Sequence, residues 1–91
     1  MSKIEYNNLI AFHPGYYISE LLENTGMSQK ELAKQLHTSE QNMIDLINGK
    51  TDLSEEIAMH LSNFFGTSVS VWLNLNQKYI EKKLEIENSM R

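Results

Sequence analysis

The chain has 91 residues, 41% hydrophobic and 22% charged, which is the composition of one globular domain with a single small core. It contains no cysteine, which excludes disulfides and thiolate metal sites, and its longest apolar run, Leu9–Phe12, is too short to cross a membrane. The formal net charge of −4 argues against broad, nonspecific nucleic-acid binding, and the lack of a signal-peptide pattern favours a cytoplasmic protein.

The first twelve residues carry weak structural signals. Two apolar segments, 4–6 and 9–12, flank Asn7-Asn8, a pattern compatible with a β-hairpin. A two-stranded hairpin alone is only marginally stable in water. We therefore expect residues 1–12 to form a short, loosely docked arm.

The first helix is expected after His13-Pro14-Gly15, because proline fits the first helical turn, where its missing N–H costs nothing. Ile18, Leu21 and Leu22 follow at helical spacing. Gly26 can adopt the left-handed conformation that ends a helix.

Two short helices follow, each beginning after a serine. Ser28 and Glu31 have the spacing of a capping box, in which each side chain bonds the other residue's N–H. Ser39 is the expected N-cap of the next helix, whose inner residues are Met43, Leu46 and Ile47. Only His37-Thr38 separates the two helices, so they must meet at a steep angle.

A fourth and a fifth helix are expected after Ser54 and Ser68. Glu55 and Glu56 suit the positive N-terminal end of the fourth helix, and Gly66 ends it. The fifth helix extends from about Val69 to Asn88. The predicted fold is therefore all-α, with five helices around one core.

The helix pair at 28–49 has the dimensions of a DNA-binding helix-turn-helix, in which the second helix lies in the major groove. Ser39, Glu40 and Gln41 occupy its N-terminus, the end that meets base edges. At about 100° per residue, the side chains opposite its buried face are Gln41, Ile44, Asp45 and Asn48.

These residues also resemble a known family. The segments Ser28–Ala33 and Leu46–Lys50, with Leu36 and Ser39 between them, resemble the phage-repressor-like (Xre) helix-turn-helix. The flanking segments His13-Pro14-Gly15, Gly66-Thr67-Ser68 and Trp72-Leu73-Asn74-Leu75 resemble the HigA antitoxin branch. The resemblance covers roughly residues 12 to 80.

The resemblance implies a homodimer that binds a palindromic operator in its own promoter and neutralises a RelE-like mRNA-cleaving toxin. It also implies roles for individual residues. Gln29 and Lys30 would meet phosphate, as would Asn42 and Lys50. Gln41, Asp45 and Glu40 would face the bases at the end of the helix that Ser39 caps.

The recognition helix departs from the family pattern in its charge. Positions 40 and 45 commonly hold hydrogen-bond donors in the family, whereas here they are Glu40 and Asp45. A carboxylate is repelled by phosphate and accepts only from groups such as the cytosine amine. A rival hypothesis is therefore a protein-interaction module whose degenerate helix-turn-helix binds a basic partner without specific DNA binding.

The end of the fifth helix carries an apolar stripe that outreaches a globule of this size, since 20 helical residues span about 30 Å. Its residues are Tyr79, Ile80, Leu84 and Ile86. We expect residues 13–77 to form the helix-turn-helix domain and 78–91 an extension that contacts a partner. A second copy of the chain is our first choice; the toxin or a frayed tail are the alternatives.

No catalytic or cofactor site is predicted. His13, His37 and His60 are spread over three segments without metal-ligand spacing, so structural or surface roles are expected. No nucleophile-elbow glycine pattern surrounds any serine. The sequence therefore favours a DNA-binding protein over an enzyme.

Overall fold

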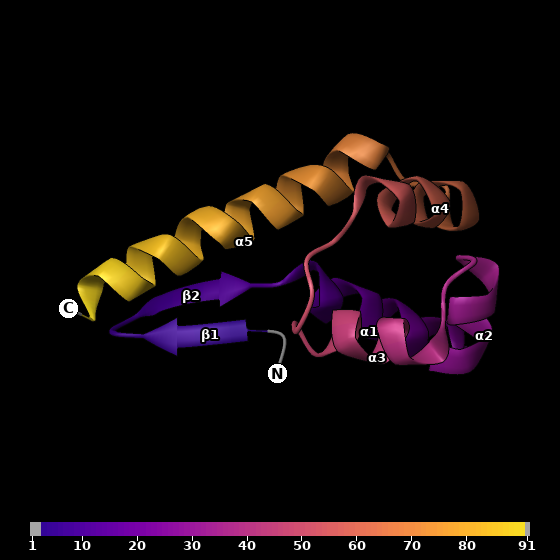
Figure 1. Ribbon diagram of the computed structural model, residues 1–91, viewed down its shortest axis with the longest axis horizontal. Helices are drawn as coiled ribbons and strands as arrows, with labels where there is room; N and C mark the ends of the chain where they lie inside the picture. The colour runs from indigo at the N-terminus through magenta and orange to yellow at the C-terminus, as the bar shows by residue number, and fades with distance from the viewer. Residues whose placement is uncertain (1–2, 91) are drawn as a thin grey trace.

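The computed structural model describes residues 3–90, and Figure 1 shows the arrangement of its elements. Within this range the chain forms one β-hairpin followed by five helices, as expected for the helical part. The elements are β1 (Lys3–Tyr6), β2 (Leu9–Phe12), α1 (Pro14–Thr25), α2 (Gln29–Gln35), α3 (Glu40–Ile47), α4 (Glu55–Phe65) and α5 (Val69–Ser89).

Serine side chains begin three of the helices, as predicted. The hydroxyls of Ser28, Ser39 and Ser54 each accept a hydrogen bond from the backbone N–H three residues ahead, at 3.0–3.1 Å. The capping box is only half formed, because the Ser28 hydroxyl donates to the Glu31 carboxylate at 3.0 Å. Ser68 precedes α5 but makes no side-chain cap bond; its hydroxyl lies 2.6 Å from that of Ser70.

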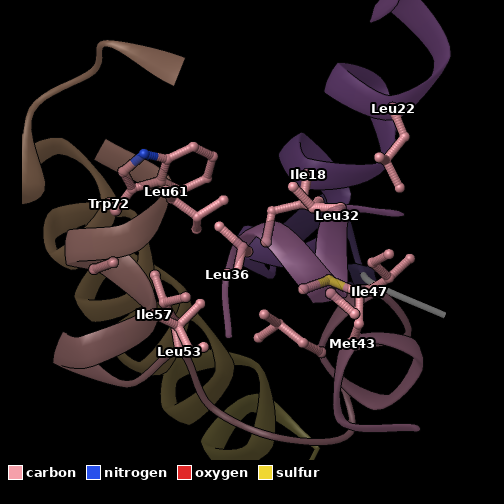
Figure 2. Packing of buried hydrophobic residues seen from close by; sticks show 13 residues of the cluster. Ile18, Leu22, Leu32, Leu36, Met43, Ile47, Leu53, Ile57, Leu61 and Trp72 are labelled. Atoms are coloured by element: carbon pink, nitrogen blue, oxygen red, sulfur yellow. The ribbon is translucent and has the colours of Figure 1, made fainter. Parts of the chain in front are cut away.

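The main core lies between the helix-turn-helix and the α4–α5 pair. Figure 2 shows Leu36, at the end of α2, between Leu61 and Trp72 on one side and Ile18 and Leu32 on the other. All five side chains are buried. Contacts from α1, α2, α4 and α5 meet at this point, so the core fixes the helix-turn-helix against the rest of the chain.

The N-terminal segment is a hairpin packed on α5, so the expectation of a loosely docked arm is wrong. Asn7 and Asn8 both have positive φ, 48° and 69°, which is the geometry of a two-residue type I′ turn. β1 and β2 pair antiparallel with Ile4 opposite Ala11. Ala11 is buried together with Tyr79 and Ile86 of α5, and this apolar contact stabilises a hairpin that alone would be marginal.

The same contact changes the interpretation of the stripe on α5. Tyr79 and Ile86 are buried against the chain's own hairpin, so their apolar character does not require a partner. Ile80 is half-buried beside the same cluster. Leu84 keeps 54% of its surface exposed. A partner contact at Ile80 and Leu84 stays a prediction.

The molecule is elongated, 41 × 22 × 21 Å, because α5 extends well past the main core. Figure 1 shows the hairpin alongside the C-terminal half of α5. Helices α2, α3 and α4 lie toward the opposite end of the molecule, near the start of α5. None of the helices in residues 3–90 is both long and apolar enough to cross a membrane.

Candidate nucleic-acid interface

The turn between α2 and α3 is built around one left-handed residue. His37 has φ 56°, a conformation that histidine tolerates better than most non-glycine residues. The N–H of Thr38 donates to the carbonyl of Ala33 at 2.9 Å, which closes the end of α2. Ser39 then caps α3, so the chain turns sharply within four residues and α2 and α3 can meet at the steep angle of a helix-turn-helix.

α3 has a polar face exposed to solvent and an apolar face packed into the core. Met43, Leu46 and Ile47 are buried, whereas Glu40, Gln41 and Asn42 are exposed. Ile44 and Asp45 are half-buried, and Asp45 lies one turn after Gln41 on the polar face. The exposed N-terminal half of α3 is therefore available to enter a groove.

Two polar side chains on this face are already oriented by hydrogen bonds. The Gln41 amide donates to the Asp45 carboxylate at 3.0 Å, and the Asn42 amide donates to the Thr38 hydroxyl at 2.7 Å. Gln41 retains its carbonyl oxygen and a second N–H. This is the donor and acceptor pair that reads adenine in the major groove. Asp45 thus orients Gln41 while placing a negative charge beside it.

The positive charge around α3 comes from lysines outside it. Within residues 3–90 none of Lys30, Lys34 and Lys50 makes an ion pair, and all three are exposed. Lys30 and Lys34 line a shallow groove of about 350 Å³ between α2 and the start of α3, which Glu40 also lines. Unpaired lysines beside a helix N-terminus suit contact with phosphate.

The residues predicted for DNA contact therefore lie at one end of the fold, with the exception of Lys50. Gln29, Lys30, Ser39, Glu40, Gln41 and Asn42 are exposed near the starts of α2 and α3, and Asp45 lies one turn further along α3. Lys50 follows the opposite end of α3. Their contact with DNA stays a prediction.

The position of α3 depends on the start of α1, at His13, Pro14 and Gly15. Gly15 lies where α1 crosses the end of α3, and a Cβ there would overlap the carbonyl oxygen of Leu46 and lie 2.8 Å from that of Ile47. The His13 Nδ1 accepts from the Gly15 N–H at 2.9 Å, and its Nε2 lies 2.8 Å from the Thr51 carbonyl oxygen. The sequence indicated a helix start here but not this crossing.

The histidines form no metal site within the described part of the chain, where no cluster of three or more potential ligands occurs. His13 is a buried structural residue whose ring also packs edge-on against Tyr79 at 4.9 Å. Burial lowers its pKa below the ordinary value for histidine. His37 and His60 pack together with ring centroids 5.0 Å apart, a contact between the turn and α4 that sequence spacing could not reveal.

The proteins that this chain is similar to agree with a helix-turn-helix fold. A helix-turn-helix family model, HTH_3, matches residues 18–72. Virulence-associated protein I of Dichelobacter nodosus is 31% identical over 80 residues, which cover 87% of this chain and 74% of that protein.

Two solved structures share the fold. An addiction module antidote protein of a HigA family from Coxiella burnetii is 34% identical, with a TM-score of 0.75 over 80% of each chain. The Pseudomonas aeruginosa antitoxin HigA, solved with the higBA promoter, is 27% identical, with a TM-score of 0.81 over 88% of each chain.

Proposed function

Since the chain belongs to the HTH_3 helix-turn-helix family, in its HigA-like branch, we propose that it is a sequence-specific DNA-binding antitoxin that represses its own promoter. The observation that carries the proposal is the exposed N-terminal face of α3, which projects Gln41 on a fold shared with a relative solved on promoter DNA. We place this activity in the cytoplasm.

In this proposal two copies bind one operator. Two-fold symmetry would set two α3 helices in successive major grooves about 34 Å apart. Gln41, held by Asp45, would read a base, with Glu40 beside it at the helix end that Ser39 caps. Gln29, Lys30, Asn42 and Lys50 would contact the phosphate backbone.

Substitution of Gln41 tests the base-reading role. Gln41→Ala is expected to weaken operator binding by about 1–3 kcal/mol, because a bidentate base contact is lost. Fluorescence anisotropy with a duplex from directly upstream of the gene measures this, against a scrambled duplex. Gln77→Ala, an exposed glutamine on α5, is the matched control. Equal affinity of the Gln41 variant and the native chain for the operator would remove Gln41 from the interface.

The second proposed activity is neutralisation of a RelE-like, mRNA-cleaving toxin encoded beside this protein. The HigA-like relatives support it, and the acidic chain suits a basic, RNA-binding partner. Co-expression of the neighbouring gene with and without this chain tests it. Growth arrest that this chain does not relieve would count against it.

The rival function is a protein-interaction module without specific DNA binding, and one observation favours it. Within α3 the charged side chains are Glu40 and Asp45, so the helix has two acids and no base. The same anisotropy titration separates the two functions. Weak binding to operator and scrambled duplex alike, lost as salt rises, is the result that the rival predicts.

A further inference from the structure

β1 offers an unpaired backbone edge. The sheet in residues 3–90 has only two strands, and β1 lies on the side of β2 away from α5 (Figure 1). The exposed side chains of β1 are Lys3 and Glu5, which pair with each other at 2.9 Å. Ile4 and Tyr6 pack toward the α5 cluster. An exposed edge strand is a template for pairing with another strand.

The turn determines which backbone groups face this edge. A two-residue type I′ turn is closed by its flanking pair, here Tyr6 and Leu9. Hydrogen-bonded pairs alternate along an antiparallel ladder, so Ile4 and Ala11 form the next such pair. The N–H and C=O groups of Lys3 and Glu5 therefore face away from β2.

A second β1 strand fits this edge in one register. When a two-fold axis passes through Ile4, Lys3 of each copy lies opposite Glu5 of the other. Both residues that face the edge then pair, with opposite charges across each pair. An axis through Lys3 or through Glu5 would instead place two like charges opposite each other.

We propose that β1 pairs with β1 of a second copy, which gives a four-stranded antiparallel sheet across the two-fold axis. This inference names the contact that joins the homodimer of the proposed function, and it rests on that function. The two Ile4 side chains would meet on the inner face, continuing the apolar layer over α5. The exposed Leu84 of α5 adds apolar surface at the same end of the molecule.

Charge-reversal variants test the register. Lys3→Glu and Glu5→Lys each turn both attractive cross-strand pairs into repulsive ones. Each variant alone is expected to dissociate at least about tenfold more readily than the native dimer. Mixed together, they restore opposite charges in both pairs, so a heterodimer should form. Sedimentation velocity and native mass spectrometry measure both outcomes.

Lys82→Glu is the control, since Lys82 is a half-buried lysine of α5 that pairs with Glu85 at 2.9 Å. It should dimerise like the native chain. A native dimer that neither variant weakens, or variants that do not recombine, would overturn the β1 contact while leaving operator binding intact. A native chain that stays monomeric at tens of micromolar would overturn both this contact and the homodimer, and the operator titration reports on DNA reading separately.

Discussion

His13 shows how one side chain links three parts of the fold. Its ring caps α1 through Nδ1, holds the loop after α3 through Thr51 and packs on Tyr79 of α5. Nδ1 accepts a hydrogen bond, so the ring must be neutral there, with the proton on Nε2. Protonation of Nδ1 would remove the acceptor at a site where His13 is only 1% exposed.

The stability of the fold should therefore depend on pH through His13. Burial lowers its pKa in the folded chain, whereas the unfolded chain titrates near the ordinary value of about 6.5. Below that pH the unfolded state binds more protons, so the free energy of unfolding falls as the pH falls toward the folded-state pKa. The expected slope is at most about 1.4 kcal/mol per pH unit.

Urea unfolding between pH 7.5 and 5 measures the slope. His13→Asn keeps a capping acceptor but does not titrate, so it should flatten the profile. A His13→Asn profile as steep as the native one would assign the pH dependence to other groups.

At the scale of elements, the position of α3 depends on its crossing with α1. Side chains normally keep helices 8–10 Å apart, but Gly15 lets the α1 backbone meet the carbonyls at the end of α3 directly. The His13-Pro14-Gly15 motif is thus a helix start and a helix-crossing site at once.

Gly15→Ala should be strongly destabilising. The new methyl group would force α1 and α3 apart against backbone atoms, which have no rotamer to change, at an expected cost of about 3 kcal/mol or more. Gly26→Ala is the control, because a Cβ there meets no atom within 4 Å and only the left-handed backbone opposes it, for about 1 kcal/mol. Chemical denaturation of both variants measures the free energy of unfolding that each substitution removes. Equal losses in the two variants would contradict the close crossing of α1 and α3.

The acids of α3 should limit its attraction to DNA. Replacing Glu40 and Asp45 by Gln and Asn is expected to raise affinity for a scrambled duplex about three- to tenfold at low salt, and less at high salt. Glu81→Gln on α5 removes an exposed acid away from α3 and should have no such effect. Anisotropy at two salt concentrations is the measurement. Unchanged affinity would show that α3 does not approach the phosphates.

The helices could be predicted from sequence because local signals specify them. Ser28, Ser39 and Ser54 mark three helix starts, and the helical spacing of apolar residues gives the buried faces. The Gln41–Asp45 bond lies at an i, i+4 spacing and is also local. The docking of the hairpin and the His37–His60 contact join distant segments, so no short-range pattern encodes them.

The whole molecule has two apolar clusters joined by one helix. The larger contains Trp72 of α5, and the smaller contains Tyr79 and Ile86 of the same helix with Ala11 of the hairpin. Among residues 3–90, these three are the buried residues of the smaller cluster. Because few apolar contacts hold it, we expect this end to open more readily than the main core.

Ile86→Ala should loosen one cluster only. Removing this fully buried side chain is expected to cost about 2–4 kcal/mol within the small cluster. Hydrogen exchange followed by mass spectrometry should show faster exchange in β1 and β2, with α2 and α3 unchanged. Leu84→Ala, at an exposed position of the same helix segment, is the control. Uniformly faster exchange would mean that the two clusters unfold as one unit.

The shared location of β1 and the last turns of α5 has a further consequence. Both segments belong to the small cluster, so a single local opening frees β1 and the last turns of α5 together. A processive protease needs a loose segment to engage before it unfolds the rest. The lifetime of the protein in a cell should therefore follow the opening of this end, and whatever covers the hairpin would prolong it while the main core stays unchanged.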